Sequence, residues 1–266
     1  MNVESRKTWG NSQPSTLHSQ LSPHDVWRDY AGVWHMNEDA GTAFDSTVHG
    51  LDGIPSSGAN GDISQMVAYE NGACGRARVN SNTNDTDGNY MLIPSYDALG
   101  LGDTFTATIW VRMNSESNYF PKVFFRYWGP KEGNKGWGAE FCYSCGNMNV
   151  VGADDFAHTR IYLRNVPIVS PKERWSQFCF VYSGTNAALY QDGCVVTNGV
   201  ILPVIDNGKP LGIGGMGGKE ASALSGQYDE IRLRGGTLSA DRIKADYDMI
   251  ANRAFLAYGK AKGNEE

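Results

Sequence analysis

The chain has 266 residues, and its 23 basic and 29 acidic side chains give a formal net charge of -6. This mixed charge carries no basic excess of the kind that phosphate backbones attract, so nucleic acid is not an expected partner. Hydrophobic residues make up 41% of the chain, enough for a core, yet no apolar run is long enough to cross a bilayer. We therefore expect a folded protein that does not insert into a membrane.

The amino-terminal residues 1–26 are expected to form a polar extension or linker. Residues 1–24 contain Pro14 and Pro23 and no apolar segment behind a basic start, so they lack the pattern of a secretory signal. The pattern changes after this segment. We expect residues 27–258 to fold as one domain and residues 259–266 to form a charged tail.

From residue 29 onward, short apolar or alternating runs are separated by clusters of Gly, Asn, Asp and Pro. This punctuation predicts about a dozen β-strands. Because so many strands do not fit comfortably into one flat sheet, we predict two packed antiparallel sheets. Asp192-Gly193 predicts a tight hairpin turn, since both residues tolerate positive φ angles. Trp34, Trp110 and Trp175 lie within predicted strands, and we expect all three to pack between the sheets.

One helix is predicted near the carboxyl end. Ser239 can cap it, Leu238 and Ile243 occupy the positions of a hydrophobic staple, and Ile243, Tyr247 and Ile250 repeat at helical spacing. We expect this short helix to lie against the sandwich near its end. Beyond it, residues 255–258 are a candidate for one more strand.

Four parts of the chain follow one another in an informative order. They are Trp27–Glu38 with Asp45–Gly53, Phe105–Val111, Trp175–Tyr182 with Leu189–Gly193, and Tyr228–Leu233 with Leu238–Ile243. Together they resemble the laminin-G-like jelly-roll domains of the concanavalin A-like lectin/glucanase superfamily. The resemblance implies an all-β, two-sheet antiparallel jelly-roll sandwich with one short C-terminal helix. Its opening segment is most similar to modules of large bacterial surface or secreted proteins, which implies an extracellular or cell-surface location.

Catalysis by carboxylates is not expected. Glycoside hydrolases of the superfamily need two carboxylates flanking the scissile bond, about 5–5.5 Å apart in retaining enzymes and further apart in inverting ones. They commonly carry a Glu-x-Asp-x-x-Glu run on one strand, and no such run occurs here. Asp154-Asp155 and Asp229-Glu230 are adjacent pairs, which we expect to point to opposite faces of a strand. None of the five histidines lies in the context of a nucleophile. No catalytic residue is predicted.

The chain has five cysteines, an odd number, so at least one thiol is free or pairs outside the chain. Cys142 and Cys145 have Cys-x-x-Cys spacing, but no second pair or clustered histidines accompany them, as structural zinc would require. Three interpretations stay open: a local or cross-strand disulfide, free buried thiols, or a fortuitous pair. Redox chemistry is disfavoured because no βαβ context surrounds the pair.

Calcium is the expected cofactor. In similar jelly-roll domains a calcium ion often joins an early Asp-Ser-x-x-x-Gly turn to the closing strand, and the matching positions are Asp45, Gly50 through its carbonyl, and Asp229. A hard cation prefers such oxygen ligands. The alternative is that both carboxylates only cap turns or accept backbone hydrogen bonds. Residues 80–89, although rich in Asp and Asn, depart from an EF-hand loop and are expected to be a solvated turn.

A sugar site needs an exposed aromatic face with planar polar groups beside it, usually on loops at the rim of a sandwich. The Gly-rich segment 127–137 carries Trp128, Asn134 and Trp137, and Tyr119 precedes it by one hairpin. These four are the candidate ligand-binding residues. The alternative is that both tryptophans are buried and anchor the loop ends.

We therefore predict a non-catalytic carbohydrate-binding or adhesion module of an extracellular bacterial protein, stabilised by calcium, with a glycan or a surface protein as its partner. A structural spacer or protein-interaction module without glycan binding is the second hypothesis. A glycoside hydrolase or lyase is the third, and two carboxyl groups converging in a concave cleft would favour it.

Overall fold

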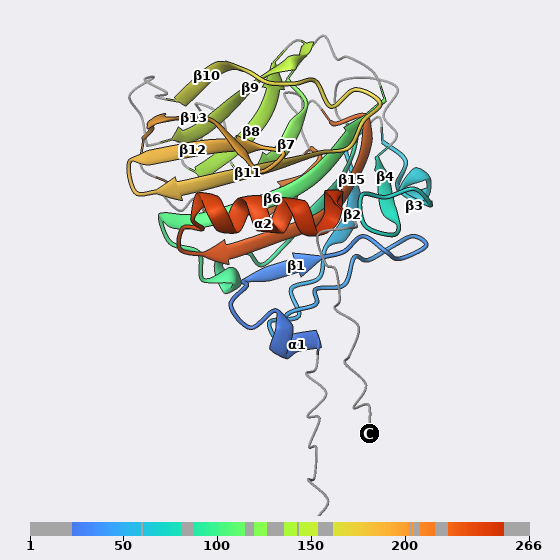
Figure 1. Cartoon of the computed structure of the whole chain (residues 1–266). Coiled ribbons are helices and arrows are strands. Elements are labelled where there is room, and N and C mark those ends of the chain that lie inside the picture. Colours follow the sequence, from blue (N-terminus) through green and yellow to red (C-terminus); the bar gives the residue numbers. More distant parts are fainter. Residues whose placement is uncertain are drawn as a thin grey trace, which may run out of the picture.

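The computed structural model describes residues 23–252 apart from residues 60, 81–87, 115–119, 127–135, 143, 154–161, 203, 205–207 and 216–222. Two antiparallel sheets pack face to face, and a helix lies against the outer face of one of them (Figure 1). This architecture confirms the predicted all-β jelly-roll sandwich with one short C-terminal helix. The proposed domain limits at residues 26 and 258 stay predictions. Within the described residues no helix is both long and apolar enough to span a membrane.

Sheet I, the sheet that carries the helix, has the strand order β13-β12-β11-β6-β15-β4-β3, and β1 pairs with β15. Its strands are β1 (Gly32–Trp34), β3 (Ala68–Tyr69), β4 (Ala77–Asn80), β6 (Thr104–Met113), β11 (Ser176–Ser183), β12 (Asn186–Gln191), β13 (Cys194–Val200) and β15 (Gly226–Gly235).

Sheet II has the order β10-β9-β8-β7-β14-β5-β2. Its strands are β2 (Ile54–Ser57), β5 (Asn89–Ile93), β7 (Lys122–Phe125), β8 (Gly136–Cys142), β9 (Ser144–Ala153), β10 (Tyr162–Pro167) and β14 (Leu211–Ile213). The helical elements are α1 (Pro23–Val26), α2 (Ala240–Ala251) and two 3-10 turns, η1 (Ile63–Gln65) and η2 (Tyr96–Leu99).

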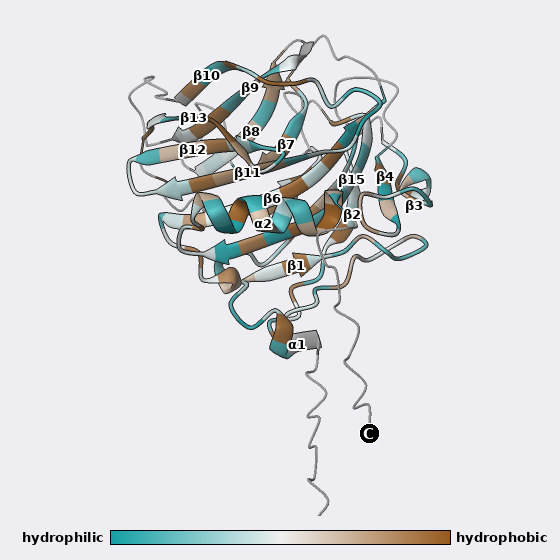
Figure 2. Ribbon diagram, viewed as in Figure 1, coloured by the Kyte–Doolittle hydropathy of each residue, from teal (hydrophilic) through white to brown (hydrophobic). Residues whose placement is uncertain are grey.

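Strand β6 shows how the layers form. Its odd-numbered residues, Phe105 through Met113, point into the core between the sheets, because successive strand side chains face opposite sides. Its even-numbered residues face the helix side. Hydrophobic and hydrophilic residues accordingly alternate along the strands (Figure 2). Burial of each large apolar side chain in this way stabilises the folded state by about 1.5–3 kcal/mol.

The three strand tryptophans take three different positions. Trp34 is fully buried between the sheets, as predicted. Trp110 is buried on the opposite face of sheet I, where its ring stacks on Tyr247 of α2 with centroids 5.5 Å apart. Trp175 is only half-buried, and its Nε1 donates to the carbonyl of Asn71 at 2.9 Å. The prediction for the last two was wrong. Trp110 is buried on the outer face because α2 covers it there, and Trp175 lies just before β11 and stays partly exposed.

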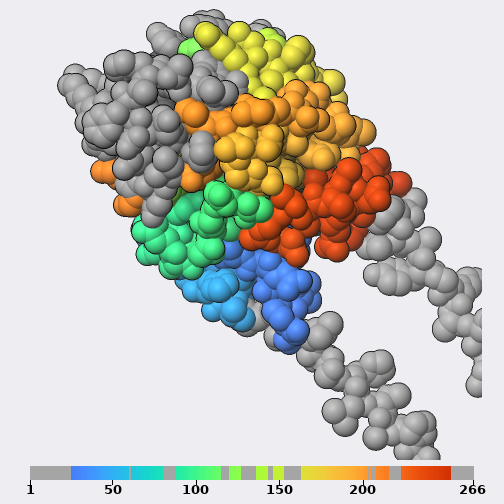
Figure 3. Space-filling view, turned by 90° about the vertical axis from the view of Figure 1, so that its left-hand side faces the viewer, coloured from blue at the N-terminus to red at the C-terminus, as the bar shows by residue number. Residues whose placement is uncertain are grey.

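Helix α2 and the hairpin beside it form as predicted. The side chain of Ser239 accepts a hydrogen bond from the backbone N–H of Arg242 at 3.3 Å, which caps the helix. Ile243 packs with Cys179 and Val181 in a second, smaller core between α2 and sheet I. The β12–β13 hairpin turns at Asp192 and Gly193, whose φ angles of 52° and 77° are both left-handed. Helix α2 lies against this hairpin (Figure 3).

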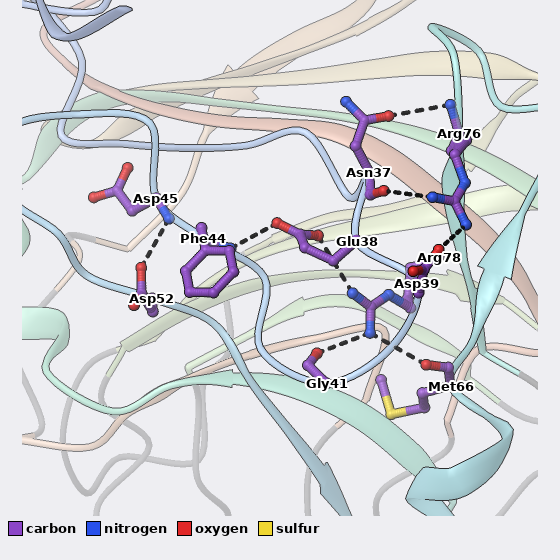
Figure 4. A network of polar contacts seen from close by, with 10 residues as sticks. All are labelled: Asn37, Glu38, Asp39, Gly41, Phe44, Asp45, Asp52, Met66, Arg76 and Arg78. Carbon is purple, nitrogen blue, oxygen red and sulfur yellow. Dashed lines mark hydrogen bonds and ion pairs between the residues drawn. The ribbon is translucent and has the colours of Figure 1, made fainter.

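A buried arginine fastens the loop after β1 to β4. Arg78 is fully buried and donates to the carbonyls of Gly41 at 2.8 Å and Met66 at 3.1 Å, and it pairs with Glu38 at 3.3 Å (Figure 4). Arg76, further out, pairs with Asp39. Since a buried charge is expensive unless it is paired, Arg78 fixes where this loop lies.

We predict that Arg78→Leu lowers the free energy of unfolding by about 3–5 kcal/mol. The substitution removes the cation that pairs with the Glu38 carboxylate and the donor to two carbonyl groups. Arg76→Leu, whose side chain is 33% exposed, is the matched control and is expected to cost no more than about 1 kcal/mol. Urea unfolding of both variants measures the difference. Equal losses would show that Arg78 has no special role.

Candidate functional site

Trp137 lies in the core and not at a surface. Its side chain has no exposed area, its Nε1 donates to the hydroxyl of Tyr96 at 2.9 Å, and its ring packs on Phe105 with centroids 4.8 Å apart. A buried ring cannot stack on a sugar, so the prediction of Trp137 as a ligand-binding residue was wrong. The structure agrees with the alternative interpretation for Trp137, that the residue is buried and anchors the end of its loop. Tyr119, Trp128 and Asn134 lie outside the described residues.

The outer face of sheet II carries a row of polar groups that crosses four strands. Lys122 of β7 pairs with Glu140 of β8, whose Oε1 accepts from Nδ2 of Asn149 on β9 at 2.8 Å. Oδ1 of Asn149 accepts in turn from the backbone N–H of Asn165 on β10 at 2.9 Å. Alternation explains the placement, because Ala139 and Phe141, the neighbours of Glu140, point into the core. We call Lys122, Glu140 and Asn149 the polar row.

An apolar row lies beside the polar row on the same face. Register places Phe125 between Gly138 and Gly212, and Gly138 pairs onward with Val151 of β9. Gly138 and Glu140 are two residues apart on one strand, so the two rows lie about 7 Å apart. This spacing is comparable to the width of one sugar ring. The Phe125 side chain is 7% exposed, whereas Trp137 has no exposed area, and the strand positions on both sides of Phe125 are glycines.

The charges in the polar row are held away from bulk water. The side chains of Lys122 and Glu140 are 8% and 15% exposed. The Lys122 ammonium also lies 5.6 Å from the ring centroid of Phe120 and 5.5 Å from that of Phe125. Such positions over aromatic rings stabilise a cation by about 0.5–2 kcal/mol. The ammonium is therefore fixed by a carboxylate on one side and by two rings on the other.

Counting only partners within the described residues, the largely buried polar row retains unused hydrogen-bonding capacity. A carboxylate has about four acceptor positions and an ammonium has three donors. Glu140 uses one position on each oxygen, and Lys122 gives one N–H to Glu140. Donors and acceptors thus remain side by side on a fixed scaffold, next to an aromatic ring. A ring-shaped ligand that carries neighbouring hydroxyl groups and one apolar face could use such adjacent donors and acceptors beside an aromatic ring.

Asp45 is satisfied by hydrogen bonds from its own surroundings. Its Oδ1 accepts from the backbone N–H groups of Val33 and Thr47, both at 3.0 Å, and its Oδ2 from the Thr47 hydroxyl at 2.7 Å and the Leu51 N–H at 3.0 Å. Gly50 lies in the same turn with a left-handed φ of 59°. Four donors fill the acceptor positions of this carboxylate, so it does not fit a calcium ligand in this arrangement.

Asp229 lies on the other side of β1 from Asp45. Trp34 of β1 pairs with Ile231 of β15 on one side and forms a bridge with Asp45 on the other. Asp229 accepts from the backbone N–H of Cys74 at 2.9 Å and of Glu230 at 2.8 Å. No group of three or more His, Cys, Asp or Glu side chains suited to a metal ion occurs among the described residues. The predicted ligands Asp45, Gly50 and Asp229 are therefore not assembled into one site.

A β-bulge reverses the expected orientation of one adjacent acidic pair. The register between β15 and β6 shifts between Asp229 and Arg232, and Glu230 has a left-handed φ of 47°. Tyr228 and Ile231 both point into the core, so Asp229 and Glu230 both face outward on sheet I. The prediction that they point to opposite faces was wrong because the extra residue breaks the alternation. Asp154 and Asp155 lie outside the described residues.

The environments of these two carboxyl groups drive their pKa values apart. Burial raises the pKa of Asp229 to about 8. Burial also opposes ionisation of Glu230, but the hydrogen bond from His35 at 2.7 Å and the charge of Arg232 lower the pKa of that group below its ordinary value. Both carboxyl groups are buried, and a β-carbon on Gly72 would lie 2.8 Å from Oδ2 of Asp229. The Gly72 backbone thus covers Asp229, and the burial of both carboxyl groups leaves neither open to a substrate in this arrangement.

Four cysteines, Cys74, Cys142, Cys179 and Cys194, are free thiols in the described part of the chain. Burial raises the pKa of Cys142 to about 11 and that of Cys179 to about 12. Thiols of this kind are inert at neutral pH. Because Cys142 is a free thiol, the Cys142–Cys145 disulfide considered from the spacing is not formed.

We predict that the pH dependence of stability changes in Asp229→Asn. In the wild type the unfolded carboxyl group ionises near pH 4 and the folded group near pH 8, so its stabilising contribution is complete below pH 4 and is lost as pH rises through 8. The variant lacks this loss. Measured in EDTA, its free energy of unfolding relative to wild type should improve by several kcal/mol between pH 5 and pH 8. Parallel curves for the two proteins would contradict this.

We also predict that calcium does not raise the melting temperature of the domain at neutral pH, because four donors already satisfy Asp45. Melting curves in millimolar calcium and in EDTA test this. A fall in EDTA that disappears in Asp229→Asn would restore the calcium ion predicted from the resemblance.

Comparison of the fold with solved structures gives matches of low sequence identity. Domain 4 of AbnA, a GH43 extracellular arabinanase from Geobacillus stearothermophilus, in complex with arabinotriose, has a TM-score of 0.60 at 15% identity, over 82% of this chain and 98% of that one. The binding domain of Paraclostridial Mosquitocidal Protein 1 has a TM-score of 0.60 at 13% identity, over 85% of this chain and 53% of that one. The binding domain of Botulinum Neurotoxin DC in complex with SialylT has a TM-score of 0.59 at 12% identity, over 84% of this chain and 52% of that one.

The chain spans about half the length of the two toxin domains and nearly all of the arabinanase domain. Comparison with curated proteins gave no match. The family model of the concanavalin A-like lectin/glucanases superfamily matches residues 84–244, more than half of the chain. The matched part includes β6 through β15 and the start of α2. The chain therefore belongs to the concanavalin A-like lectin/glucanase superfamily.

Proposed function

We propose that this chain is a non-catalytic carbohydrate-binding module whose ligand lies on the outer face of sheet II. The observation that carries the proposal is the polar row. A fixed carboxylate, ammonium and amide lie next to one another, with unused donors and acceptors, beside the Phe125 ring. Carbohydrate recognition combines an apolar surface with a few fixed polar groups in this way.

The comparisons support a binding role without identifying the ligand. The similar arabinanase domain is in complex with arabinotriose, and one similar toxin domain is in complex with SialylT. The arabinanase is described as extracellular. We include in the proposal that this chain also acts outside the cell or at its surface, as an adhesion or binding module. Tyr119, Trp128 and Asn134 stay in it as candidate contacts, because in sequence Tyr119 precedes β7 and the other two lie between β7 and β8, the strands that carry Lys122 and Glu140.

A protein partner is the second candidate function. The similar binding domain of Botulinum neurotoxin DC is also known in complex with rat synaptotagmin II, with a TM-score of 0.58 at 10% identity over 84% of this chain. A glycoside hydrolase is less well supported. The adjacent residues Asp229 and Glu230 are both buried. Within the described residues Glu140 is joined by a lysine and an amide, whereas hydrolysis needs a second carboxyl group.

The test uses a charge-neutral double variant of the polar row. Removing one partner of a nearly buried ion pair costs about 3–5 kcal/mol, whereas replacing both is often close to neutral. We therefore expect Lys122→Met/Glu140→Gln to keep the melting temperature within a few degrees and to lower glycan retention at least tenfold. Screening the purified chain on a glycan array, followed by titration of any glycan that binds, measures the loss.

The matched control is Lys244→Met/Asp248→Asn, which removes a lysine–carboxylate pair on α2, against the opposite sheet. Glycan retention in this control should equal that of the wild type. Equal retention in both double variants would place the glycan elsewhere. A wild-type chain that retains no glycan on the array would overturn the proposal in favour of a protein-binding module.

A further inference from the structure

A second cluster of side chains lies on the outer face of sheet I, beyond the end of α2. Helix α2 reaches Trp110 of β6 through Tyr247. Arg112 lies two residues further along the same face of β6 and is only half-buried. Tyr69 of β3 and Trp175, just before β11, are half-buried as well. We call Arg112, Tyr69 and Trp175 the arginine cluster.

The guanidinium of Arg112 is held in one orientation from beneath. Its Nη1 donates to Oε1 of Gln227 at 3.0 Å, and Nε2 of Gln227 donates to Oδ1 of Asn114 at 2.9 Å. Gln227 is 4% exposed and pairs with Arg112 in the register of β15 with β6. Both the oxygen and the nitrogen of the Gln227 amide are therefore hydrogen-bonded, and this orients the Arg112 guanidinium.

The rest of this guanidinium has no anion partner in the described part of the chain. Arginine presents five N–H donors in a planar fork, and the bond to Gln227 uses one of them. By contrast, Arg174 nearby is bound to Asp192 and to the hydroxyl of Ser176. Arg112 is thus a fixed cation whose outward N–H groups are free to bind a carboxylate in bidentate fashion.

One aromatic ring lies near the guanidinium, and a second lies close by in the same part of sheet I. Its central carbon lies 5.8 Å from the centroid of Tyr69. Trp175 stands one residue before Ser176, which pairs with Val111, so the register of β11 with β6, continued by one residue, would bring Trp175 opposite Arg112. The hydrogen bond from Trp175 to the carbonyl of Asn71 fixes the indole ring. A ligand with a flat apolar face can therefore pack on these rings while its anionic group meets the arginine.

The surrounding charges leave this position open to an anion. Lys172, which forms a bridge with Met113 next to Arg112, is exposed. Glu173 is exposed on the same turn, and Glu70 pairs with Arg76 at 3.2 Å. Asp229, on the neighbouring row of this face, lies beneath the Gly72 backbone. None of these carboxyl groups forms an ion pair with Arg112.

We infer that the arginine cluster binds a carboxylate-bearing sugar, in which Arg112 takes the carboxylate and Tyr69 and Trp175 pack on the ring. A sugar acid fits better than an acidic peptide, because two rings near one arginine suit a cyclic ligand that carries its charge on the ring. The site is separate from the polar row on sheet II, and the inference stands whether or not that row binds a neutral glycan.

The experiment titrates the full chain with tetragalacturonate and with its methyl ester, which keeps the sugar rings and removes the charges. We expect tetragalacturonate to bind, the ester to bind at least tenfold more weakly, and the affinity to fall as salt is raised. Arg112→Gln should weaken binding at least tenfold with an unchanged melting temperature. Arg112→Lys should restore only part of it, since lysine lacks the planar fork.

Arg174→Gln is the matched control, an arginine on the same side whose partners lie within the chain, and it should bind as the wild type does. Trp175→Phe keeps a ring and should lose less affinity than Trp175→Ala. Equal binding of the acid and its ester would overturn the inference. So would binding that is lost in Lys122→Met/Glu140→Gln but kept in Arg112→Gln, or pentaglutamate binding through Arg112 as tightly as tetragalacturonate.

Discussion

Burial of strand β6 on both faces is the constraint on which the rest of the structure depends. Its odd-numbered side chains fill the core between the sheets, and Trp110 on the other face must be covered as well, which Tyr247 of α2 does. The helix is therefore not an appendage but the third layer of the packing. Once α2 occupies this face of sheet I, the sheet faces that the described residues leave uncovered by the helix are the outer face of sheet II and the end of sheet I beyond α2.

The bulge in β15 shows how a single extra residue changes what a strand can carry. It places Asp229 and Glu230 on one face, where perfect alternation would separate them. The contacts of the two residues hold neighbouring segments together. Glu230 pairs with His35 and Arg232, and so joins the segment after β1 to β15, while Asp229 holds the backbone at Cys74. The same two residues, seen only as a carboxyl pair with divergent pKa values, would suggest an acid and a base.

The parts of the fold that were predictable from the sequence depend on local patterns. Alternation, the Asp192-Gly193 turn and the Ser239 cap act within a few residues of one another, so the chain itself displays them. The polar row does not: Lys122 and Glu140 are 18 residues apart, and Asn149 is 9 residues beyond Glu140. Only the register of three strands brings them together. A signal was present in β8, because a strand that points Trp137 inward must point Glu140 outward.

The two candidate sites differ in the chemistry that each leaves available, and this difference follows from their partners. On sheet II the Lys122 cation is already neutralised by Glu140, so the polar row offers matched donors and acceptors and favours neutral hydroxyl groups. On sheet I the Arg112 cation is held by a neutral amide, which orients it without cancelling its charge, so that position favours an anion. Because the sites lie on the outer faces of opposite sheets, one short glycan cannot occupy both. Two different glycans can, and a module that binds a neutral chain on one face and an acidic chain on the other would link them.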